Sequence, residues 1–288
     1  MDKEKYQKQR EFTFTENDFS RIRKIIYQHA GIALSEAKDD MVYSRVARRL
    51  RAIGYDTFKE YLNDLERQQD AEEWEAFTNA LTTNLTSFFR EEHHFPILAD
   101  HLLTLQKPIR LWCNAASTGE EPYTLAITAC EAFGSLNPPV EIIATDIDTN
   151  VLETAAAGVY AMDRVSHLSA KQLKAFFHKG TGAREGSVKV RSELQRLITF
   201  SPLNLLEEKW PVQGPFDAIF CRNVMIYFDK PTQSKVLERF TPLMKAETLL
   251  FAGHSENFIY VSKDFQLLGR SVYQLKNNNA ATAKKIAA

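Results

Sequence analysis

Residues 109–133 read IRLWCNAASTGEEPYTLAITACEAF, and they contain three local patterns in a row. The apolar run IRLWC is typical of a buried strand, NAASTG of a turn, and EPYTLAITACEAF of a helix. The same order recurs as EIIATDID followed by TNVLETAAAG, and as FDAIFCRNVMIYF followed by KPTQSKVLERFTPLM. Strands that alternate with helices favour a parallel, doubly wound sheet. We therefore predict an α/β fold.

Two segments depart from this alternation. The run FQLLGRSVYQLK, residues 265–276, has no helix between its halves, so a tight turn at Gly269-Arg270 predicts an antiparallel hairpin on the sheet edge. Residues 158–197 form a connection too long for a simple crossover, which is typical of a functional segment or a small subdomain. This connection contains a capped helix, SAKQLKAFF, and its glycines predict hairpin turns or close backbone approach: Gly180, Gly182 and Gly186.

The N-terminal region, residues 15–83, has helical patterns only. Thr15 or Asn17 caps a first helix that Gly31 ends, and a second helix covers residues 37–53 up to Gly54. Two more helices are expected near 56–67 and 71–82. The polar tail NNNAATAKKIAA, residues 277–288, is expected to be disordered.

Composition narrows the class of protein. The chain has 288 residues, 44% hydrophobic and 25% charged, with a formal net charge of −1. This balance gives no broad attraction for nucleic acid or anionic membrane. No apolar run is long enough to span a bilayer, and the polar N-terminus does not resemble a secretory signal. The three cysteines are scattered singly, which predicts no zinc site, no disulfide framework and a reduced, cytoplasmic compartment.

The ends of the predicted strands indicate a nucleoside ligand. In an open parallel sheet the ligand lies beyond the carboxyl ends of the strands, which here carry NAASTGEE, TDID, SPLN and CRNVMIY. Asp146 follows Gly119 by 27 residues. This separation is near the roughly 20 residues typical of an acid that binds ribose hydroxyls.

The loop after the first strand argues against phosphate. A dinucleotide fingerprint has three glycines, whereas this loop has only Gly119 and places Glu120 and Glu121 at the helix start. Two carboxylates would repel a pyrophosphate from the helix N-terminus. A ligand with an amine and a sulfonium, such as S-adenosylmethionine, would pair with Glu121 and bind Asp146 through its ribose. The alternative is that both acids merely complement the helix dipole.

Other motifs leave choices open. The stretch TNLTSFFREEHHFP, residues 83–96, is either a packed interdomain loop or a cover over a site. His93-His94 has no partner at metal spacing, and GHSEN, residues 253–257, lacks the spacing of a serine hydrolase. Residues 41–55 contain no acid but four arginines, which form either a solvated helix face or a docking face for an acidic partner: Arg45, Arg48, Arg49 and Arg51.

Together, several stretches resemble the CheR family of chemotaxis receptor methyltransferases, the protein-glutamate O-methyltransferases of bacterial chemotaxis, close to the enteric enzymes. The resemblance covers about residues 15–276. The stretches that carry it are NALTTNLTSFFREEHHFP, AASTGEEPYTLAI, ATDIDTNVL, GPFDAIFCRNVMIYFD and LLFAGHSENF.

The resemblance implies a class I S-adenosylmethionine-dependent methyltransferase with a Rossmann-like, mostly parallel sheet and an antiparallel edge hairpin. The implied domains are an all-α domain (1–83), a linker contributing to the active site (84–92), a methyltransferase domain (93–276), an inserted small β subdomain (162–197) and the tail (277–288).

The resemblance also implies residue roles. The implied contacts of S-adenosylmethionine and its product S-adenosylhomocysteine are Asn84, Thr86, Arg90, Glu121, Asp146, Asn204, Leu205, Arg222 and Asn223. Arg90 and Tyr227 would face the reacting carboxylate. Gly180, Gly182 and Gly186, with Lys189 or Arg191, would bind a tethering peptide at the receptor C-terminus, and the arginine-rich helix would read the receptor's helical bundle. No metal, nucleic acid or membrane insertion is implied, and we expect a monomer.

The implied reaction transfers a methyl group to a receptor glutamate. A glutamate side chain, with a reference pKa of about 4.3, is ionised at neutral pH and needs no general base. Alignment of carboxylate, methyl and sulfur would then supply the catalysis. Two alternatives remain: a class I methyltransferase acting on nucleic acid or an amide nitrogen, and a non-catalytic module that senses S-adenosylmethionine or scaffolds receptors. NVMIY lacks the two prolines of the Asn-Pro-Pro-Tyr motif frequent in nitrogen methyltransferases.

Overall fold

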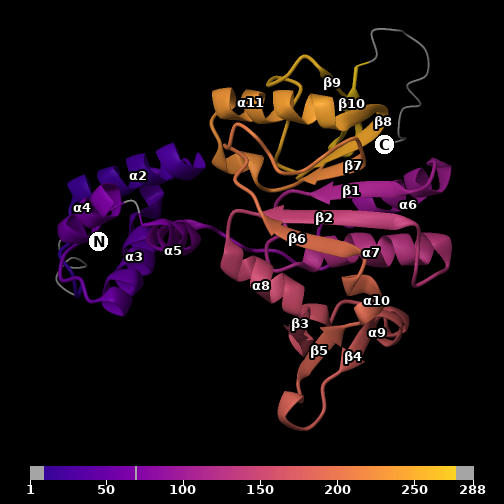
Figure 1. Cartoon of the computed structure of the whole chain (residues 1–288), viewed down its shortest axis with the longest axis horizontal. Helices are drawn as coiled ribbons and strands as arrows, with labels where there is room; N and C mark the ends of the chain where they lie inside the picture. The colour runs from indigo at the N-terminus through magenta and orange to yellow at the C-terminus, as the bar shows by residue number, and fades with distance from the viewer. Residues whose placement is uncertain (1–9, 69, 277–288) are drawn as a thin grey trace. The chain divides into compact units, whose positions relative to one another are not determined.

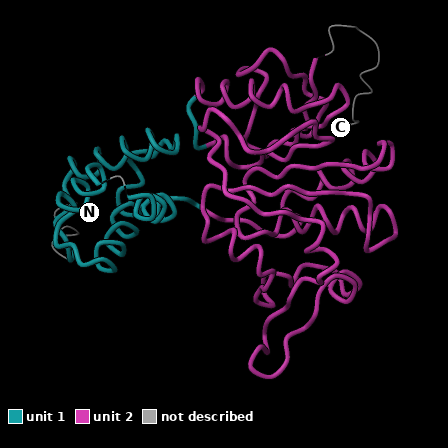
Figure 2. The backbone as a smooth tube through the Cα atoms, viewed as in Figure 1, with its two compact units in different colours: residues 1–83, 227–229 teal, residues 84–226, 230–288 magenta. Residues whose placement is uncertain are grey.

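The computed structural model describes residues 10–68 and 70–276. The chain folds into two compact units, coloured separately in Figure 2. The first contains the described residues up to Thr83 together with Tyr227–Asp229, and the second runs from Asn84 to Ile226 and resumes at Lys230. The predicted disordered tail, 277–288, lies outside the described residues. Among the described helices, none is both long and apolar enough to cross a membrane.

The first unit is helical, as predicted. Its helices are α2 (Glu16–Ala30), α3 (Asp39–Ile53), α4 (Phe58–Gln68) and α5 (Ala71–Leu81), with the short 3-10 turn η1 (Glu36–Lys38) before α3. Thr15 caps α2 in a capping box with Asp18, and Gly31 ends it in the left-handed conformation. The apolar faces of these helices are buried against one another, with Ile22, Val46, Leu62 and Phe77 fully inaccessible.

The second unit is built on a seven-stranded sheet in the order β6-β2-β1-β7-β8-β10-β9. Strands β6, β2, β1, β7 and β8 are parallel, whereas β10 runs antiparallel to both β8 and β9, which confirms the predicted edge hairpin. The strands are β1 (Ile109–Cys113), β2 (Val140–Asp146), β6 (Ile198–Pro202), β7 (Phe216–Cys221), β8 (Met244–Ala252), β9 (Phe265–Gly269) and β10 (Val272–Leu275).

Helices cover both faces of this sheet (Figure 1). On one face, α6 (His94–Thr104) packs against α7 (Glu120–Phe133), and Phe95 of α6 stacks on Phe220 with ring centroids 6.4 Å apart. On the other face, the ring of Phe240 in α11 (Lys230–Phe240) packs edge-on against Trp112, with ring centroids 5.5 Å apart. Successive strand residues point to opposite faces, so the central strands β1 and β7 bury apolar side chains on both sides, apart from the charged Arg110 and Asp217 near their starts.

The order of the strands fixes where a ligand site can form. Chain order runs from β1 to β2 and β6 on one side, and continues with β7 and β8 on the other side of β1. Cys113, the last residue of β1, is in register with Ala144 of β2 and Phe220 of β7. The carboxyl ends of the three strands therefore meet at the topological switch point, which is where doubly wound sheets bind ligands.

A second, three-stranded sheet is inserted between α8 (Thr149–Ala157) and β6. Its order is β3-β5-β4, with both pairs antiparallel. Because β3 already forms at Val159, the insertion begins before the predicted range of 162–197. Its elements are β3 (Val159–Ala161), η2 (Met162–Val165), α9 (Ala170–Phe176), β4 (Phe177–Lys179), η3 (Gly182–Arg184), β5 (Ser187–Val190) and α10 (Ser192–Gln195).

Gly119 explains why the loop after β1 needs one glycine. It precedes α7 with a φ of 97°, a left-handed conformation that side chains rarely adopt. A Cβ atom here would lie 2.8 Å from both the Ala155 Cβ and the Tyr160 hydroxyl. The glycine therefore serves the turn and the close packing of the insertion's first strand, and no phosphate is needed to account for it.

Gly119→Ala and Gly134→Ala compare the two ends of the same helix. Gly134, at the C-terminus of α7, also has a positive φ of 61°, but an added Cβ would meet nothing within 4 Å. We expect Gly134→Ala to cost about 1 kcal/mol of unfolding free energy through left-handed strain. Gly119→Ala should cost roughly 1–3 kcal/mol more because of the collision. Urea denaturation measures both, and equal losses would contradict the close-packing role.

Candidate functional site

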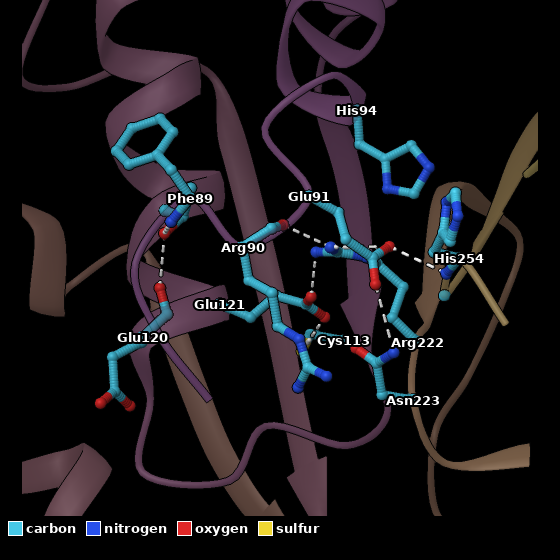
Figure 3. Close-up of polar contacts among 12 residues, drawn as sticks. Phe89, Arg90, Glu91, His94, Cys113, Glu120, Glu121, Arg222, Asn223 and His254 are labelled. Carbon is cyan, nitrogen blue, oxygen red and sulfur yellow. Dashed lines mark hydrogen bonds and ion pairs between the residues drawn. The ribbon is translucent and has the colours of Figure 1, made fainter. Parts of the chain in front are cut away.

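Glu121 occupies the first turn of α7, directly beyond the end of β1. Its carboxylate accepts a hydrogen bond from the Arg222 guanidinium and another, at 3.3 Å, from the Cys113 thiol. Burial raises the pKa of the Cys113 thiol well above its usual value, so this thiol acts as a neutral donor. Figure 3 shows Glu121 and Arg222 pointing toward each other across the ends of β1 and β7.

Arg222 follows β7 and carries a buried charge. Its side chain is 1% exposed and lies between two acids, Glu121 and Glu91, with Glu91 at 3.2 Å. It also donates to the Arg90 backbone carbonyl. A buried guanidinium without compensating partners would cost several kcal/mol. Arg222 therefore joins the loop after β1, the linker and the end of β7 into one arrangement.

Glu91 was not among the predicted site residues. Its carboxylate accepts hydrogen bonds from the His254 amide at 3.1 Å and from the Asn223 side chain at 3.2 Å, besides its ion pair with Arg222. Burial alone would raise the pKa of Glu91, but the charge of Arg222 and these hydrogen bonds outweigh it and lower the pKa. The sequence EEHH, residues 91–94, contains no pattern that predicts a buried, paired role for Glu91.

Glu256 shapes the loop that follows β7. Its buried carboxylate accepts backbone N–H bonds from Asn223 at 2.9 Å, Met225 at 2.8 Å and Gly253 at 2.5 Å. Burial raises the pKa of Glu256, although these amides partly offset the effect. The motif GHSEN thus supplies a carboxylate that organises backbone amides. The spacing of GHSEN in the sequence does not indicate this role for Glu256.

Asp146 ends β2 and holds the neighbouring loop. Its carboxylate accepts from the backbone amides of Ser117 at 2.8 Å and Asp148 at 3.0 Å. Burial raises the pKa of Asp146 to about 6 despite these hydrogen bonds. The Leu203 amide donates to the Asp146 carbonyl at 2.9 Å. This contact brings the end of β6, with half-buried Asn204 and buried Leu205, beside the same edge of the sheet.

The linker packs onto the ends of the strands, which is compatible with both interpretations of residues 83–96, a packed interdomain loop and a cover over a site. The Asn84 side chain donates to Asp148 at 2.7 Å, and the Asn84 carbonyl accepts from the Ser117 hydroxyl at 2.9 Å. The Phe89 amide donates to the Thr124 hydroxyl at 3.1 Å. The half-buried Arg90 side chain donates to the Leu85 carbonyl at 2.8 Å.

Glu120 and Glu121 have separate partners. The Glu120 side chain is fully buried, accepts from the Thr118 hydroxyl at 2.6 Å and forms an ion pair with Arg164 of η2. In Figure 3 its carboxylate points away from the cluster of Glu121, Arg222 and Glu91. Both acids are paired with arginines, Glu120 with Arg164 and Glu121 with Arg222. They therefore do more than complement the helix dipole.

Asn114 provides an observation that suits a bound ligand. This residue follows β1 and is 3% exposed, yet within the described residues its amide has no hydrogen bond to a nitrogen or oxygen atom, and its side chain interacts only weakly with the Cys221 thiol. Its neighbour, the Cys221 thiol, is a weak donor and acceptor. The buried Arg222 Nε also lacks a partner within the described residues. Buried polar groups are normally satisfied, so these atoms suit a polar ligand at the switch point.

The donor set of this edge favours a cationic nucleoside over a phosphate. Carboxylates lie at this edge after three strands: Glu121 after β1, Asp146 at the end of β2 and Glu256 after β8. The N-terminus of α7, which would otherwise attract an anion, carries two acids. The described residues contain no cluster of three or more His, Cys, Asp or Glu side chains able to hold a metal. S-adenosylmethionine, with its amine, its sulfonium and its ribose, matches this chemistry.

The predicted docking face on α3 is largely engaged within the helical unit. Arg45 donates to the carbonyls of Ala80, at 3.3 Å, and Thr82, and so satisfies the end of α5. On the same helix, Arg49 pairs with Glu73 and Arg51 pairs with Glu11. Arg48 is exposed and makes no side-chain contact that the described residues record. Within residues 10–68 and 70–276, three of the four arginines of the basic face are therefore engaged by acids or carbonyls of the helical unit.

Tyr227 and Arg90 belong to different units. Tyr227 ends the 3-10 turn η4 (Met225–Tyr227) and is part of the helical unit, where its carbonyl accepts from the Ala33 amide at 2.9 Å. Close by in the chain, Asp229 accepts from the Tyr27 hydroxyl at 2.6 Å. Arg90 lies in the sheet unit.

In the insertion, Lys189 and Arg191 have different environments. Lys189 is exposed on β5, in register with Val159 and His178. The Arg191 guanidinium donates to the Lys174 carbonyl at 3.2 Å and is partly buried. Of the loop glycines, Gly182 and Gly186 have positive φ angles of 58° and 82°, whereas a Cβ at Gly180 would lie 2.0 Å from the Arg184 carbonyl oxygen. Lys189 is thus the better placed of the two cations to meet a peptide.

Comparisons with known proteins agree with this geometry. Two family models match, the CheR methyltransferase SAM binding domain over residues 84–274 and the CheR methyltransferase all-alpha domain over residues 17–82. A chemotaxis protein methyltransferase of Salmonella typhimurium is 55% identical over 262 residues, 91% of each chain. The Escherichia coli protein of the same description is 53% identical, over 90% of this chain and 91% of the relative. Chemotaxis protein methyltransferase 2 of Pseudomonas aeruginosa is 51% identical over 91% and 94%.

The raised pKa of Asp146 predicts a pH-dependent cofactor affinity. Folding raises the pKa of Asp146 to about 6, so the ligand-free fold loses stability as pH rises through that value and the carboxyl group ionises. A ligand that binds the ionised carboxylate offsets this loss. Affinity for S-adenosylhomocysteine should be constant near neutral pH and fall about tenfold per pH unit below 6. Calorimetry from pH 5 to 7.5 measures this. Asp146→Asn should flatten the acidic limb, and a flat wild-type profile would contradict ribose binding by the ionised carboxylate.

Proposed function

The chain belongs to the CheR family of S-adenosylmethionine-dependent methyltransferases, and we propose that it methylates glutamate side chains of membrane chemoreceptors. The proposal rests on the chemotaxis relatives together with one structural observation, the cluster of Glu121, Arg222 and Glu91 at the switch point. Adaptation of receptors in the cytoplasm by a monomeric enzyme is part of the same proposal. Analytical ultracentrifugation showing a stable dimer at micromolar concentration would reject the monomer.

The proposed cofactor contacts all come from elements at the carboxyl edge of the sheet. The linker, the loop after β1 and the ends of β2, β6 and β7 each contribute, and hydrogen bonds tie these segments to one another. Asn114 is added to the set because its buried amide has no nitrogen or oxygen partner in the described residues, and the Cys221 thiol beside it is only a weak one. The proposed contacts are Asn84, Thr86, Arg90, Asn114, Glu121, Asp146, Asn204, Leu205, Arg222 and Asn223.

The chemistry needs orientation more than proton transfer. S-adenosylmethionine supplies an electrophilic methyl group when bound. The acceptor glutamate is ionised at neutral pH, so it can attack without a general base, and an ester is the product. Arg90 is proposed to hold the acceptor carboxylate through its planar guanidinium, and Tyr227 to hold its other oxygen or to shape the pocket. Arg90 is only half buried and has one side-chain hydrogen bond among the described residues, so most of its donors are available.

The identity of the methylated atom tests the proposal. Radiolabelled S-adenosylmethionine is incubated with the enzyme and receptor-containing membranes, and the labelled protein is then treated with alkali. We expect volatile methanol, because carboxyl methyl esters are base-labile. Stable label would indicate a nitrogen acceptor, and label in nucleic acid the other methyltransferase alternative. Absence of any label would favour a sensor or scaffold.

Arg90→Ala and Arg48→Glu separate the two arginine roles. Arg90→Ala should lower kcat by roughly 100-fold at saturating substrates, the cost of a misplaced reactant, with a much smaller loss of cofactor affinity. Arg48→Glu should raise the KM for receptor and leave kcat and cofactor affinity unchanged. Arg67→Glu, an exposed reversal on α4 paired only with Asp64, is the matched control. Unchanged kcat in the first variant, or an unchanged receptor KM in the second, would remove the corresponding role.

We also propose that the insertion binds an acidic peptide at the receptor C-terminus. Residues 158–197 contain eight Lys or Arg but three Asp or Glu, although the whole chain is nearly neutral. Exposed Lys189 lies on β5, between its register partners Val159 and His178. A peptide carboxylate would meet this cation, and the loop of Gly180, Gly182 and Gly186 would allow close backbone approach.

Binding of a synthetic peptide with the receptor's C-terminal sequence tests this surface by calorimetry. Lys189→Glu should abolish detectable binding, and Lys189→Arg should tighten it severalfold because a guanidinium binds a carboxylate bidentately. Lys209→Glu reverses an exposed charge outside the insertion and serves as the control. If Lys189→Glu and Lys209→Glu bind the peptide equally well, Lys189 is not the contact.

A further inference from the structure

Arg164 joins three segments that are far apart in the sequence. It lies on η2 of the insertion and forms an ion pair with Glu120 of α7, with its Nε 3.1 Å from the carboxylate. Its Nη2 also donates to the Thr86 carbonyl of the linker at 3.1 Å. One guanidinium thus connects the insertion, the start of α7 and the linker. None of the roles assigned above to site residues involves Arg164.

The burial of Glu120 makes this contact more than a surface ion pair. The Glu120 side chain is fully inaccessible, whereas that of Arg164 is 39% exposed. A buried carboxylate needs a charged or hydrogen-bonding partner in the fold, and its partners here are Arg164 and the Thr118 hydroxyl. Arg164 is therefore held at a defined place by α7, and its Nη2, which also bonds Glu120, donates to the linker backbone.

Two further side chains of the insertion contact the same segments. The His167 Nε2 donates to the Phe88 carbonyl at 2.8 Å. The Tyr160 hydroxyl donates to the Thr118 carbonyl at 2.7 Å and fills the space beside Gly119. The base of the insertion therefore contacts the linker at two carbonyls, Thr86 and Phe88, and the loop after β1 at a third. Side chains rather than a continuous sheet make these contacts.

We propose that Arg164 is a positioning residue for the cofactor, because it fixes the linker in the conformation that presents Asn84, Thr86 and Arg90. The inference rests on the proposed cofactor contacts of the linker. Other linker contacts lie on either side of this point: the Asn84 side chain before it, and the Phe88 carbonyl, the Phe89 amide and the Arg90 carbonyl after it. Arg164 holds the stretch between them. Without the Arg164 side chain, the methyl-transfer step itself would be unchanged. The linker would, however, adopt several conformations, of which only one binds the cofactor, so cofactor affinity would fall.

The test uses Arg164→Lys in the full chain. Lysine keeps the positive charge beside Glu120, but its ammonium group lacks the planar guanidinium whose Nε and Nη2 both bond Glu120 while Nη2 also donates to Thr86. We expect the Kd for S-adenosylhomocysteine to rise about tenfold, equivalent to 1.4 kcal/mol. We expect kcat at saturating S-adenosylmethionine to change less than twofold. Arg196→Lys, an exposed arginine in the same insertion, should leave the Kd unchanged.

A second variant covers the case in which Arg164→Lys fails to fold. The pair Glu120→Gln with Arg164→Gln removes both charges at once, so no unpaired charge stays buried. The folded double variant should show the same rise in Kd, because glutamine at position 164 is too short to serve both partners. A wild-type Kd in either folded variant overturns the positioning role. A lowered melting temperature with a normal Kd also overturns it, because Arg164 would then act on stability alone.

Asn84→Ala and Thr86→Val distinguish the failure of this inference from the failure of its premise. If both bind S-adenosylhomocysteine as tightly as wild type, the linker does not contact the cofactor and the premise fails. If either binds weakly while Arg164→Lys binds normally, the contacts stand and the positioning role of Arg164 is rejected. Weak binding in the linker variants and in Arg164→Lys, with Arg196→Lys normal, supports both.

Discussion

The buried charge of Arg222 is the constraint on which the site depends. A guanidinium that is 1% exposed must have its charge and its donors compensated, and Glu121 and Glu91 supply the charge. These acids come from the start of α7 and from the linker, so compensation of one charge fixes both segments against the end of β7. Glu256 then holds the following turn through backbone amides. The carboxyl edge of the sheet is organised by carboxylates, which suits a cationic ligand and excludes a phosphate.

The sequence predicted the fold well because local periodicity and long-range packing agree there. Apolar runs such as IRLWC form parallel strands that are buried except at Arg110, and Thr15, Gly31 and Gly54 mark helix ends as expected. The acids at the start of α7 also pointed to the right class of ligand, since Glu120 and Glu121 argue against pyrophosphate without any tertiary information. The start of the insertion was less predictable, because β3 has three residues and acquires its partner, β5, only through the tertiary fold.

The roles of Glu91, Glu256 and Arg164 could not be predicted from local patterns. Each depends on a partner brought close by topology: Glu91 on Arg222, 131 residues away in the chain, and Arg164 on Glu120. Composition was also a poor guide to α3, where four arginines in an acid-free stretch suggested a free basic face. Acids from other segments, Glu11 and Glu73, pair with two of them. Charge patterns along one helix do not reveal cross-segment pairing.

The insertion's attachment bears on how a tethered receptor would be presented. It leaves the sheet unit after α8 and returns before β6, and Tyr160, Arg164 and His167 contact the linker and the loop after β1. These contacts join its base to the cofactor edge. On the proposed function, a receptor tail bound at Lys189 would raise the effective concentration of receptor glutamates near the site. With the base fixed, the size of that increase depends on the receptor's own linker rather than on movement of the insertion.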